Sequence, residues 1–290
     1  MYLNPVQATI NEYEFKLFQN YINKISGIII PPEKAYLIES KLSKLMMDSG
    51  AENFGDFYDY IISNTDPGIA QKIINVIAIN ETMWFRDSMP WAVLEKIYLP
   101  TLVDEIVSGR KIKARIWCSA VSTGQEVYSA IICINEYLKK NPTRGVSLAN
   151  FEFFATDIST HVIDIAQKGK YDRISISRGL SEDFREKYFR YTEAAWEISP
   201  EIKNKAKFQR FDLREGYDAF GTFDIIFCRY VLIYFTDKLK KEIIGKLYNS
   251  LSDEGLIFTG NYVLYDMFKD RFDSKPYNNS TYFSKRKVTK

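Results

Sequence analysis

The chain has 290 residues, of which 46% are hydrophobic, 15% aromatic and 26% charged, and this composition excludes a disordered or fibrous protein. Its 39 basic and 37 acidic residues leave a formal net charge of only +2, which does not favour nucleic acid as a partner. We find no apolar stretch near the length of about 18 residues that a membrane span needs, and no secretory signal pattern. We therefore expect a cytoplasmic protein that does not insert into a membrane.

Apolar residues recur three and four positions apart through the first part of the chain, a spacing typical of helices. The first predicted helix ends at Gly27, the second lies between Pro31 and Gly50, and two more lie on either side of the loop "NTDPG". We expect a small all-helical domain over residues 1–80. A linker and a connecting helix are expected over residues 81–110.

The pattern changes after residue 110 to short apolar runs separated by helical stretches, which predicts an α/β domain over residues 111–290. Strands and helices that alternate in this way favour a parallel sheet covered on both faces. The stretch over residues 171–205 follows neither rhythm and is interpreted as an insertion. We expect the last stretch to add an antiparallel edge strand. The predicted strands are "KARIWCSA", "FEFFATD", "AKFQRFDL", "FDIIFCR", "GLIFTGN" and "STYFSKRK".

The stretch "RIWCSAVSTGQEVYSAI" at 115–131 predicts a strand, a bend of small residues and a helix. Ligands bind at such bends, beyond the carboxyl ends of parallel strands, and Gly124 allows a close approach of the backbone. The bend has neither the three glycines of a dinucleotide site nor the pattern of a phosphate loop. Instead it carries the acid Glu126, and the next strand ends in Asp157.

These two acids suit a nucleoside that has no phosphate and carries a cationic amino acid tail. Asp157 can accept hydrogen bonds from ribose hydroxyls, and Glu126 can face the positive charge. S-adenosylmethionine fits this description. The alternative for Asp157 is a helix cap within "TDIST".

Cysteine and histidine are scarce and scattered, so we expect no metal site. Cys118, Cys133 and Cys228 each lie in an apolar stretch, which is typical of free thiols in a reducing compartment. The single histidine, His161, lies at a predicted helix start, where a solvated or capping role is more common than a catalytic one.

Four motifs resemble the CheR family of chemotaxis receptor glutamate methyltransferases. They are "INETMWFRD" at 79–87, "IWCSAVSTGQEVYS" at 116–129, "FFATDIS" at 153–159 and "FDIIFCRYVLIYF" at 223–235. The likeness covers nearly the whole chain. It implies a small helical domain joined to a Rossmann-like class I methyltransferase domain with a short inserted β-subdomain.

The resemblance also implies an activity, a cofactor and partners. Members transfer a methyl group from S-adenosylmethionine to glutamate side chains on the cytoplasmic helices of chemoreceptors, and S-adenosylhomocysteine is the other product. Motif matching places Arg86 and Tyr234 at catalytic positions. The expected cofactor positions are Asn80, Thr82, Arg86, Gly124, Glu126, Asp157, Asp212, Leu213, Arg229 and Tyr230. For Arg86 the alternative is a surface ion pair with Asp87 or Glu81.

The sequence departs from the family at several points. Tyr230 stands where asparagine is usual, and "GNYVLYDMF" lacks a usual Ser-Glu pair. The tyrosine is expected either to crowd the cofactor pocket, so that Tyr230→Asn raises turnover, or to turn aside or stack on the adenosine. The insertion is also short, so we expect no tight binding of a receptor's carboxyl-terminal pentapeptide. A monomer is expected.

Two other functions stay open from the sequence. One is a catalytically weak module that binds S-adenosylmethionine for sensing or scaffolding, which the unusual Tyr230 suggests. The other is a methyltransferase for a different carboxylate acceptor.

Overall fold

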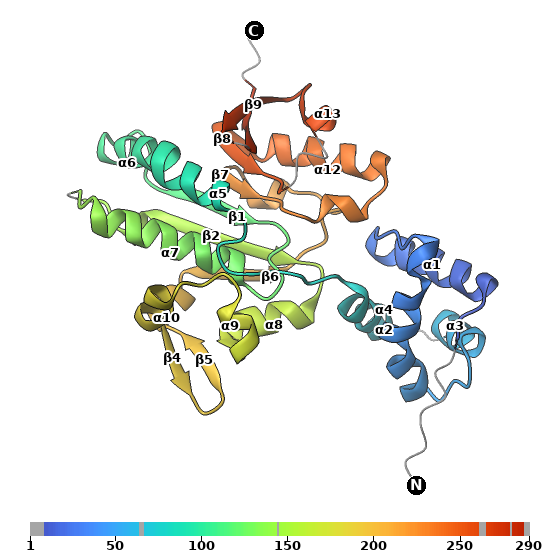
Figure 1. Cartoon of the computed structure of the whole chain (residues 1–290). Helices are drawn as coiled ribbons and strands as arrows, with labels where there is room; N and C mark the ends of the chain where they lie inside the picture. The colour runs from blue at the N-terminus through green and yellow to red at the C-terminus, as the bar shows by residue number, and fades with distance from the viewer. Residues whose placement is uncertain (1–8, 64–66, 144, 261–264, 279, 287–290) are drawn as a thin grey trace.

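The computed structural model describes residues 9–63, 67–143, 145–260, 265–278 and 280–286. A helical domain at one end packs against a larger domain built on a twisted sheet (Figure 1). A 3₁₀ turn at Pro32–Lys34 precedes the second helix. The helices of the first domain are α1 (Glu12–Ser26), α2 (Ala35–Asp48), α3 (Phe54–Ser63) and α4 (Pro67–Ile77).

Helix α1 shows why this part of the chain folds as the spacing predicts. Asn11 and Glu14 form a capping box at its start, and Gly27 ends it in the left-handed conformation with φ 77°. Its apolar face packs on α3, where Phe18 contacts the rings of Phe54 and Phe57 at centroid distances of 5.7 and 5.8 Å. The helical core therefore forms around a cluster of aromatic side chains.

Two helices separated by a π-helical turn join the helical domain to the sheet. They are α5 (Ser88–Val93) and α6 (Leu99–Val107), and the turn between them is η2 (Leu94–Tyr98). Tyr98 anchors this connection, because its hydroxyl donates to the backbone oxygens of Asp224 and Glu254 at 3.1 and 3.0 Å.

The central sheet has seven strands in the order β6-β2-β1-β7-β8-β10-β9. Neighbours from β6 to β8 run parallel, and the last two pairs are antiparallel. The strands are β1 (Ala114–Cys118), β2 (Phe151–Asp157), β6 (Ala206–Arg210), β7 (Phe223–Phe227), β8 (Leu251–Phe258), β9 (Phe272–Tyr277) and β10 (Ser280–Lys285). This mostly parallel sheet and the helical domain confirm the predicted fold class.

The inner strands of the sheet, such as β1, β2 and β7, are largely buried on both faces, as their apolar sequences require. Ile116 and Cys118 of β1 face one core, and Trp117 between them faces the other. Helices α6 and α7 pack on the first side, and α12 packs on the second beside the helical domain. The remaining helices and 3₁₀ turns of this domain are α7 (Gln125–Lys140), η3 (Leu148–Asn150), α8 (Thr160–Lys168), η4 (Asp218–Phe220), η5 (Leu232–Tyr234), α12 (Asp237–Asn249) and α13 (Tyr265–Phe268).

The segment expected to be an insertion forms a second, three-stranded sheet in the order β3-β5-β4. Trp84 holds it in place, because the indole contacts Tyr171 and Phe189 edge-on and donates to the Ser175 oxygen at 3.1 Å. The elements are β3 (Lys170–Tyr171), α9 (Arg173–Ser177), α10 (Glu182–Tyr188), β4 (Phe189–Thr192), β5 (Ala195–Ile198) and α11 (Pro200–Lys203).

The expectation of an edge strand at "STYFSKRK" is wrong in its position. This strand, β10, is antiparallel as predicted but lies inside the sheet between β8 and β9. The edge on this side of the sheet is β9, whose sequence "FDSKPY" is polar and contains Pro276. An edge strand tolerates a proline because one side of its backbone needs no partner strand.

Candidate active site

A cavity lies at the carboxyl ends of the parallel strands, where the sheet meets the helical domain. The empty space in and at the mouth of this cavity is about 1090 Å³, a volume that includes open solvent. Ser26 and Ile28, at the end of α1, form part of its wall. Of the predicted site residues, those that line the cavity are Asn80, Thr82, Arg86, Glu126, Asp157, Asp212, Leu213, Arg229, Tyr230 and Tyr234.

The bend between β1 and α7 brings backbone amides close to this cavity. Ser122 has a left-handed backbone with φ 52°, and its N–H donates to Asp157 Oδ2 at 2.9 Å. The Ser122 hydroxyl donates to the backbone oxygen of Asn80 at 2.9 Å. Gly124, with φ 98°, does not line the cavity, since a Cβ there would point at Ala166 Cβ only 3.0 Å away. Gly124 therefore allows the bend to pack closely on Ala166, on the side away from the cavity.

Arg229 is the centre of a buried ion-pair network beneath the cavity. Its Nη1 donates to Glu126 Oε2 at 2.9 Å, and its Nη2 donates to Asp87 Oδ2 at 2.7 Å. Only 2% of the Arg229 side chain is exposed. Its Nε has no hydrogen-bond partner among the described residues. Glu126, predicted to face the positive charge of a ligand, is therefore also paired with Arg229.

Arg86 lies at the cavity wall with its guanidinium over an aromatic ring. Its Cζ is 3.7 Å from the centroid of Tyr230, and its Nη1 donates to the backbone oxygen of Glu81 at 3.0 Å. The carboxylates of Glu81 and Asp87 pair with other arginines. Neither acid is therefore committed to Arg86, in contrast to the surface ion pair considered as its alternative role.

Tyr230 is held from both ends. Its hydroxyl donates to Asp87 Oδ2 at 2.6 Å, and its backbone is left-handed with φ 59°. A Cβ at Gly260 would lie 2.9 Å from the Tyr230 ring, so glycine there makes room for the tyrosine. The ring therefore stacks on Arg86. Residues 261–264 of the altered segment that follows lie outside the described residues.

Tyr234 lies in the 3₁₀ turn η5, beyond the end of β7. It is partly buried and lines the cavity near Arg86. Its backbone oxygen accepts a hydrogen bond of 2.9 Å from the N–H of Ile29. The helical domain therefore helps to fix this turn.

Two acids lie at the carboxyl ends of the neighbouring strands β2 and β6: Asp157 is the last residue of β2, and Asp212 lies two residues beyond β6. Asp157 is buried and accepts from the N–H groups of Ser122 and Ser159 at 2.9 and 3.0 Å. The cap of α8 is Ser159, whose side chain accepts from Val162, so Asp157 is not the helix cap. Asp212 is also buried, and its carboxylate pairs with Arg214 at 2.6 Å.

The environment shifts the pKa of several of these groups. Burial raises the pKa of the Asp157 carboxyl, although three backbone hydrogen bonds oppose the shift. Burial likewise raises the pKa of Glu126, against the effect of the Arg229 guanidinium. For Asp87, partial burial is outweighed by the hydrogen bonds from Tyr230 and Arg229, so its pKa is lowered. Burial destabilises the ionised form of Asp157 and Glu126, and a ligand that donates hydrogen bonds to these carboxylates would stabilise that form.

The donor set fits a nucleoside with an amino acid tail. Asp157 and Asp212 can accept hydroxyl or amino hydrogens from the nucleoside end. At the other end, Arg229 can meet the carboxylate of the tail, and Glu126 can meet its ammonium group. The residues present therefore fit S-adenosylmethionine.

The described residues show neither a metal-binding cluster nor a membrane-spanning helix. Within them, no group of three or more histidine, cysteine or acidic side chains is placed to hold a metal ion. The same part of the chain contains no helix long and apolar enough to cross a bilayer.

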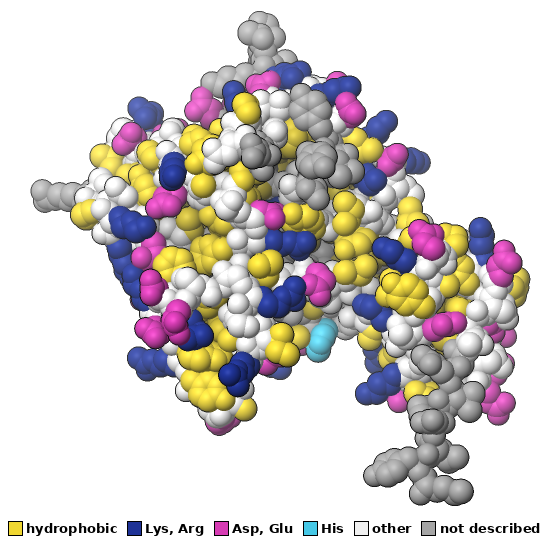
Figure 2. Space-filling view, in the orientation of Figure 1, with side chains coloured by type: hydrophobic (Ala, Val, Ile, Leu, Met, Phe, Trp, Pro, Cys, Tyr) yellow, Lys and Arg dark blue, Asp and Glu magenta, His cyan; other side chains and the backbone are white. Residues whose placement is uncertain are grey.

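Figure 2 shows basic and acidic side chains interspersed over the visible face, in line with the small net charge. His161 is exposed.

A mostly parallel sheet with a cavity at the carboxyl ends of its strands is a Rossmann-like arrangement, as found in class I methyltransferases. Residues 80–278 match the model described as "CheR methyltransferase, SAM binding domain", and residues 13–78 match "CheR methyltransferase, all-alpha domain". The chain belongs to the CheR family of chemotaxis methyltransferases, which use S-adenosylmethionine. The resemblance inferred from the four motifs is thereby confirmed.

Curated relatives agree with the family models. The chain is 34% identical to chemotaxis protein methyltransferase 1 of Pseudomonas aeruginosa over 85% of this chain and 88% of that protein. It is 33% identical to a chemotaxis protein methyltransferase of Pseudomonas putida over the same shares. A chemotaxis protein methyltransferase of Vibrio anguillarum is 31% identical over 91% of this chain and 94% of that protein.

Several residues of the site were not found from the sequence. Asp87 joins Arg229 to Tyr230, and Arg214 holds Asp212. A signal for Asp87 exists, because it lies within the motif "INETMWFRD". Arg214 follows the motif "RFDL" directly, and this position is all that could have pointed to it. A single arginine in a predicted loop is usually interpreted as a solvated side chain.

Proposed function

We propose that this protein methylates glutamate side-chain carboxylates on chemoreceptors, forming methyl esters, with S-adenosylmethionine as the methyl donor. The observation that carries the proposal is the position of Arg86 and Tyr234 on the wall of the same cavity that holds the buried acids Asp157 and Asp212. One cavity therefore contains both the acids that can bind a nucleoside and the arginine that can bind the carboxylate of an acceptor. Family membership supports an enzyme over a sensing module without turnover.

The cofactor would lie along the cavity with its nucleoside at Asp157, Asp212 and Leu213. Its amino acid tail would lie near Glu126 and Arg229. Asn80, Thr82 and Tyr230 would complete the wall, and Gly124 would hold the bend in shape. Bound S-adenosylmethionine supplies a methyl group on a positively charged sulfur.

The acceptor needs little acid–base help, because a glutamate carboxylate is already ionised at neutral pH. Arg86 would hold one carboxylate by charge-assisted hydrogen bonds, and Tyr234 would donate a hydrogen bond beside it. These contacts align a carboxylate oxygen with the methyl carbon and the sulfur. The new O–C bond would form as the S–C bond breaks, with its electron pair returning to sulfur, so no proton would have to move.

The partners would be the cytoplasmic helices of methyl-accepting chemoreceptors. The inserted sheet β3-β5-β4 is small, so we propose that the protein does not bind a receptor's carboxyl-terminal pentapeptide tightly. Calorimetry with such a pentapeptide tests this point, and a dissociation constant in the low micromolar range would contradict it.

The function is tested by incubating the purified chain with methyl-labelled S-adenosylmethionine and membranes that contain chemoreceptors. We expect label in the receptor that is released as methanol by mild base. Transfer to a small carboxylic acid but not to receptor would favour a different acceptor. Cofactor binding without any transfer would favour a sensing module. Membranes that lack chemoreceptors are the control.

A further inference from the structure

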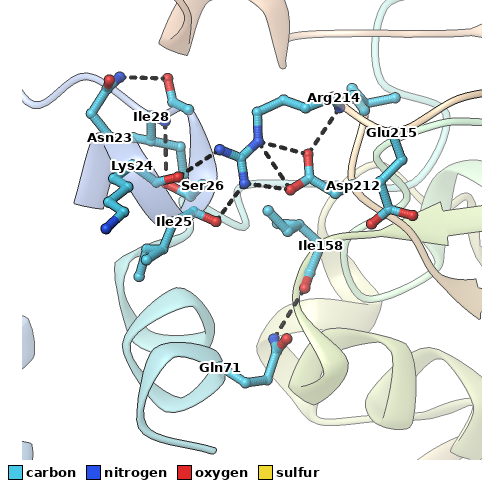
Figure 3. Close-up of polar contacts among 12 residues, drawn as sticks. Asn23, Lys24, Ile25, Ser26, Ile28, Gln71, Ile158, Asp212, Arg214 and Glu215 are labelled. Carbon is cyan, nitrogen blue, oxygen red and sulfur yellow. Dashed lines mark hydrogen bonds and ion pairs between the residues drawn. The ribbon is translucent and has the colours of Figure 1, made fainter. Parts of the chain in front are cut away.

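The segment that follows Asp157 and the loop that carries Asp212 are both tied to the helical domain. Helix α4 supplies the first tie: Gln71 Nε2 donates to the Ile158 oxygen at 3.1 Å, directly after Asp157 (Figure 3). One turn further on, Asn75 Nδ2 donates to Thr160 Oγ1 at 3.1 Å. These bonds join α4 to the start of α8.

Arg214 supplies the second tie. Its Nε lies 3.1 and 3.0 Å from the two carboxylate oxygens of Asp212, and its Nη2 lies 2.6 Å from Oδ2. Its Nη1 also donates to the Lys24 oxygen at 2.8 Å, and its Nη2 to the Ile25 oxygen at 2.5 Å. Figure 3 shows the guanidinium between the end of α1 and the Asp212 carboxylate.

The end of α1 is suited to this cation. Its last carbonyls carry partial negative charge and lack partners within the helix. Gly27 then turns the chain sharply, and a Cβ there would lie 3.1 Å from Arg214 Cδ. Ser26 and Ile28, on either side of Gly27, line the cavity. One guanidinium therefore joins two walls of the same cavity that come from different domains.

Asp212 depends on this contact for its orientation. It is 5% exposed, and a carboxylate buried to this degree needs compensating charge and hydrogen bonds. The forked geometry of arginine provides both, whereas lysine would provide a point charge without the fork. The guanidinium therefore adds to the bond of 2.9 Å from the Arg214 N–H to Asp212 Oδ1, and together they orient the carboxylate.

We infer that Arg214 is a positioning residue that makes cofactor binding depend on docking of the helical domain. This inference rests on the proposed function, in which the cavity takes S-adenosylmethionine. If only the docked form binds the nucleoside, the apparent dissociation constant equals the intrinsic one divided by the docked fraction. By linkage, a bound nucleoside must in turn favour docking.

The test compares Arg214→Ala and Arg214→Lys with Arg210→Ala. Arg210 is a matched control, because it lies nearby and pairs with Glu215 at 2.7 Å at the surface. Calorimetry with S-adenosylhomocysteine should show affinity at least tenfold weaker for Arg214→Ala, several-fold weaker for Arg214→Lys and unchanged for Arg210→Ala. A variant that had merely lost folded protein would bind fewer equivalents at the wild-type dissociation constant.

Hydrogen exchange of the wild-type chain supplies the reciprocal measurement. S-adenosylhomocysteine should slow exchange at the end of α1 around Gly27, and Arg214→Ala should lose most of that protection. Wild-type affinity in Arg214→Ala, or no protection of α1 in the wild type, overturns the inference. Failure of the wild type to bind S-adenosylhomocysteine overturns the proposed function instead.

Turnover supplies the third readout. The KM for S-adenosylmethionine should rise in Arg214→Ala, while kcat at saturating cofactor stays within about threefold of wild type. Loss of kcat with an unchanged KM would contradict a role in positioning the nucleoside.

Discussion

The guanidinium carbon of Arg86 lies 3.7 Å above the ring of Tyr230, and the hydroxyl of the same tyrosine donates to Asp87 at 2.6 Å. The tyrosine thereby links the residue proposed to hold the acceptor with the ion-pair network around Arg229. An asparagine at this position would have no ring to offer Arg86. Tyr230, which stands where the family usually has asparagine, therefore makes specific contacts with Arg86 and Asp87.

Replacing Arg86 by alanine should impair methyl transfer far more than cofactor binding. A hydrogen bond to a charged group contributes about 1.5 to 3 kcal/mol, which corresponds to a loss of roughly tenfold to a hundredfold or more. We expect that loss in kcat/KM for the acceptor, with the dissociation constant of S-adenosylhomocysteine within about threefold of wild type. Arg86→Lys, which keeps the charge, is the control. Equal losses in both quantities would refute this division of roles.

Replacing Tyr230 separates its ring from its hydroxyl. Tyr230→Phe keeps the ring under Arg86, so the KM for the acceptor should stay near wild type. Tyr230→Asn loses the cation–π contact, worth about 0.5 to 1 kcal/mol at an exposed site, and should raise that KM about twofold to fivefold. Its thermal stability should not fall as a result of backbone strain, since asparagine tolerates φ 59° better than tyrosine. Higher turnover with an unchanged KM would instead support the expectation that the tyrosine crowds the pocket.

Cofactor affinity should depend on pH through Asp157. Burial raises the pKa of this carboxyl, so it takes up a proton at a higher pH than an ordinary aspartate, whose pKa is about 3.9. A protonated carboxyl accepts hydrogen bonds less well, so affinity is complete above the raised pKa and is lost as the pH falls through it. Calorimetry with S-adenosylhomocysteine over a descending pH series measures this loss.

Asp157→Asn is the matched variant for that series. It should bind more weakly at neutral pH and lose most of the pH dependence, leaving a part due to Glu126, whose pKa is also raised. An unchanged pH profile in the variant would assign the effect to another group.

Replacing Gly124 by alanine should destabilise the chain more than replacing Gly109. Both glycines have positive φ, 98° and 73°, so alanine at either costs about 1 to 2 kcal/mol of strain. Only at Gly124 does the new Cβ also meet neighbours, at 3.0 to 3.1 Å. Crowding should add at least about 1 kcal/mol, measured as a difference in the free energy of unfolding in urea. Equal losses would show that the packing behind the bend relaxes freely.

The strands that form the floor of the site could be predicted because burial dictates their sequence. β1, β2 and β7 lie inside a parallel sheet, so their side chains are apolar on both faces and stand out as continuous runs. β9 could not be found in this way. As an edge strand it buries less, tolerates Pro276 and carries polar residues.

Asp157 was predictable for a related reason, because it ends the buried strand β2. Asp212 follows the mostly exposed strand β6 and was predicted only through the resemblance to the family. The network around Arg229 was not predictable. Phe85, Asp87 and Tyr230 all have left-handed backbones, yet no glycine marks these turns. Charge pairs that join distant segments, such as Arg229 with Glu126 or Arg214 with the end of α1, leave no local pattern in a sequence.

The position of β10 has a consequence for how the chain is made. Ribosomes release β8 and β9 before β10, yet β10 must lie between them. Until its residues emerge, β8 exposes an unpaired row of backbone groups beside β7, and such an edge can recruit other chains. A nascent or shortened chain that stops before Ser280 would therefore lose an inner strand of the sheet and be left open to aggregation along β8.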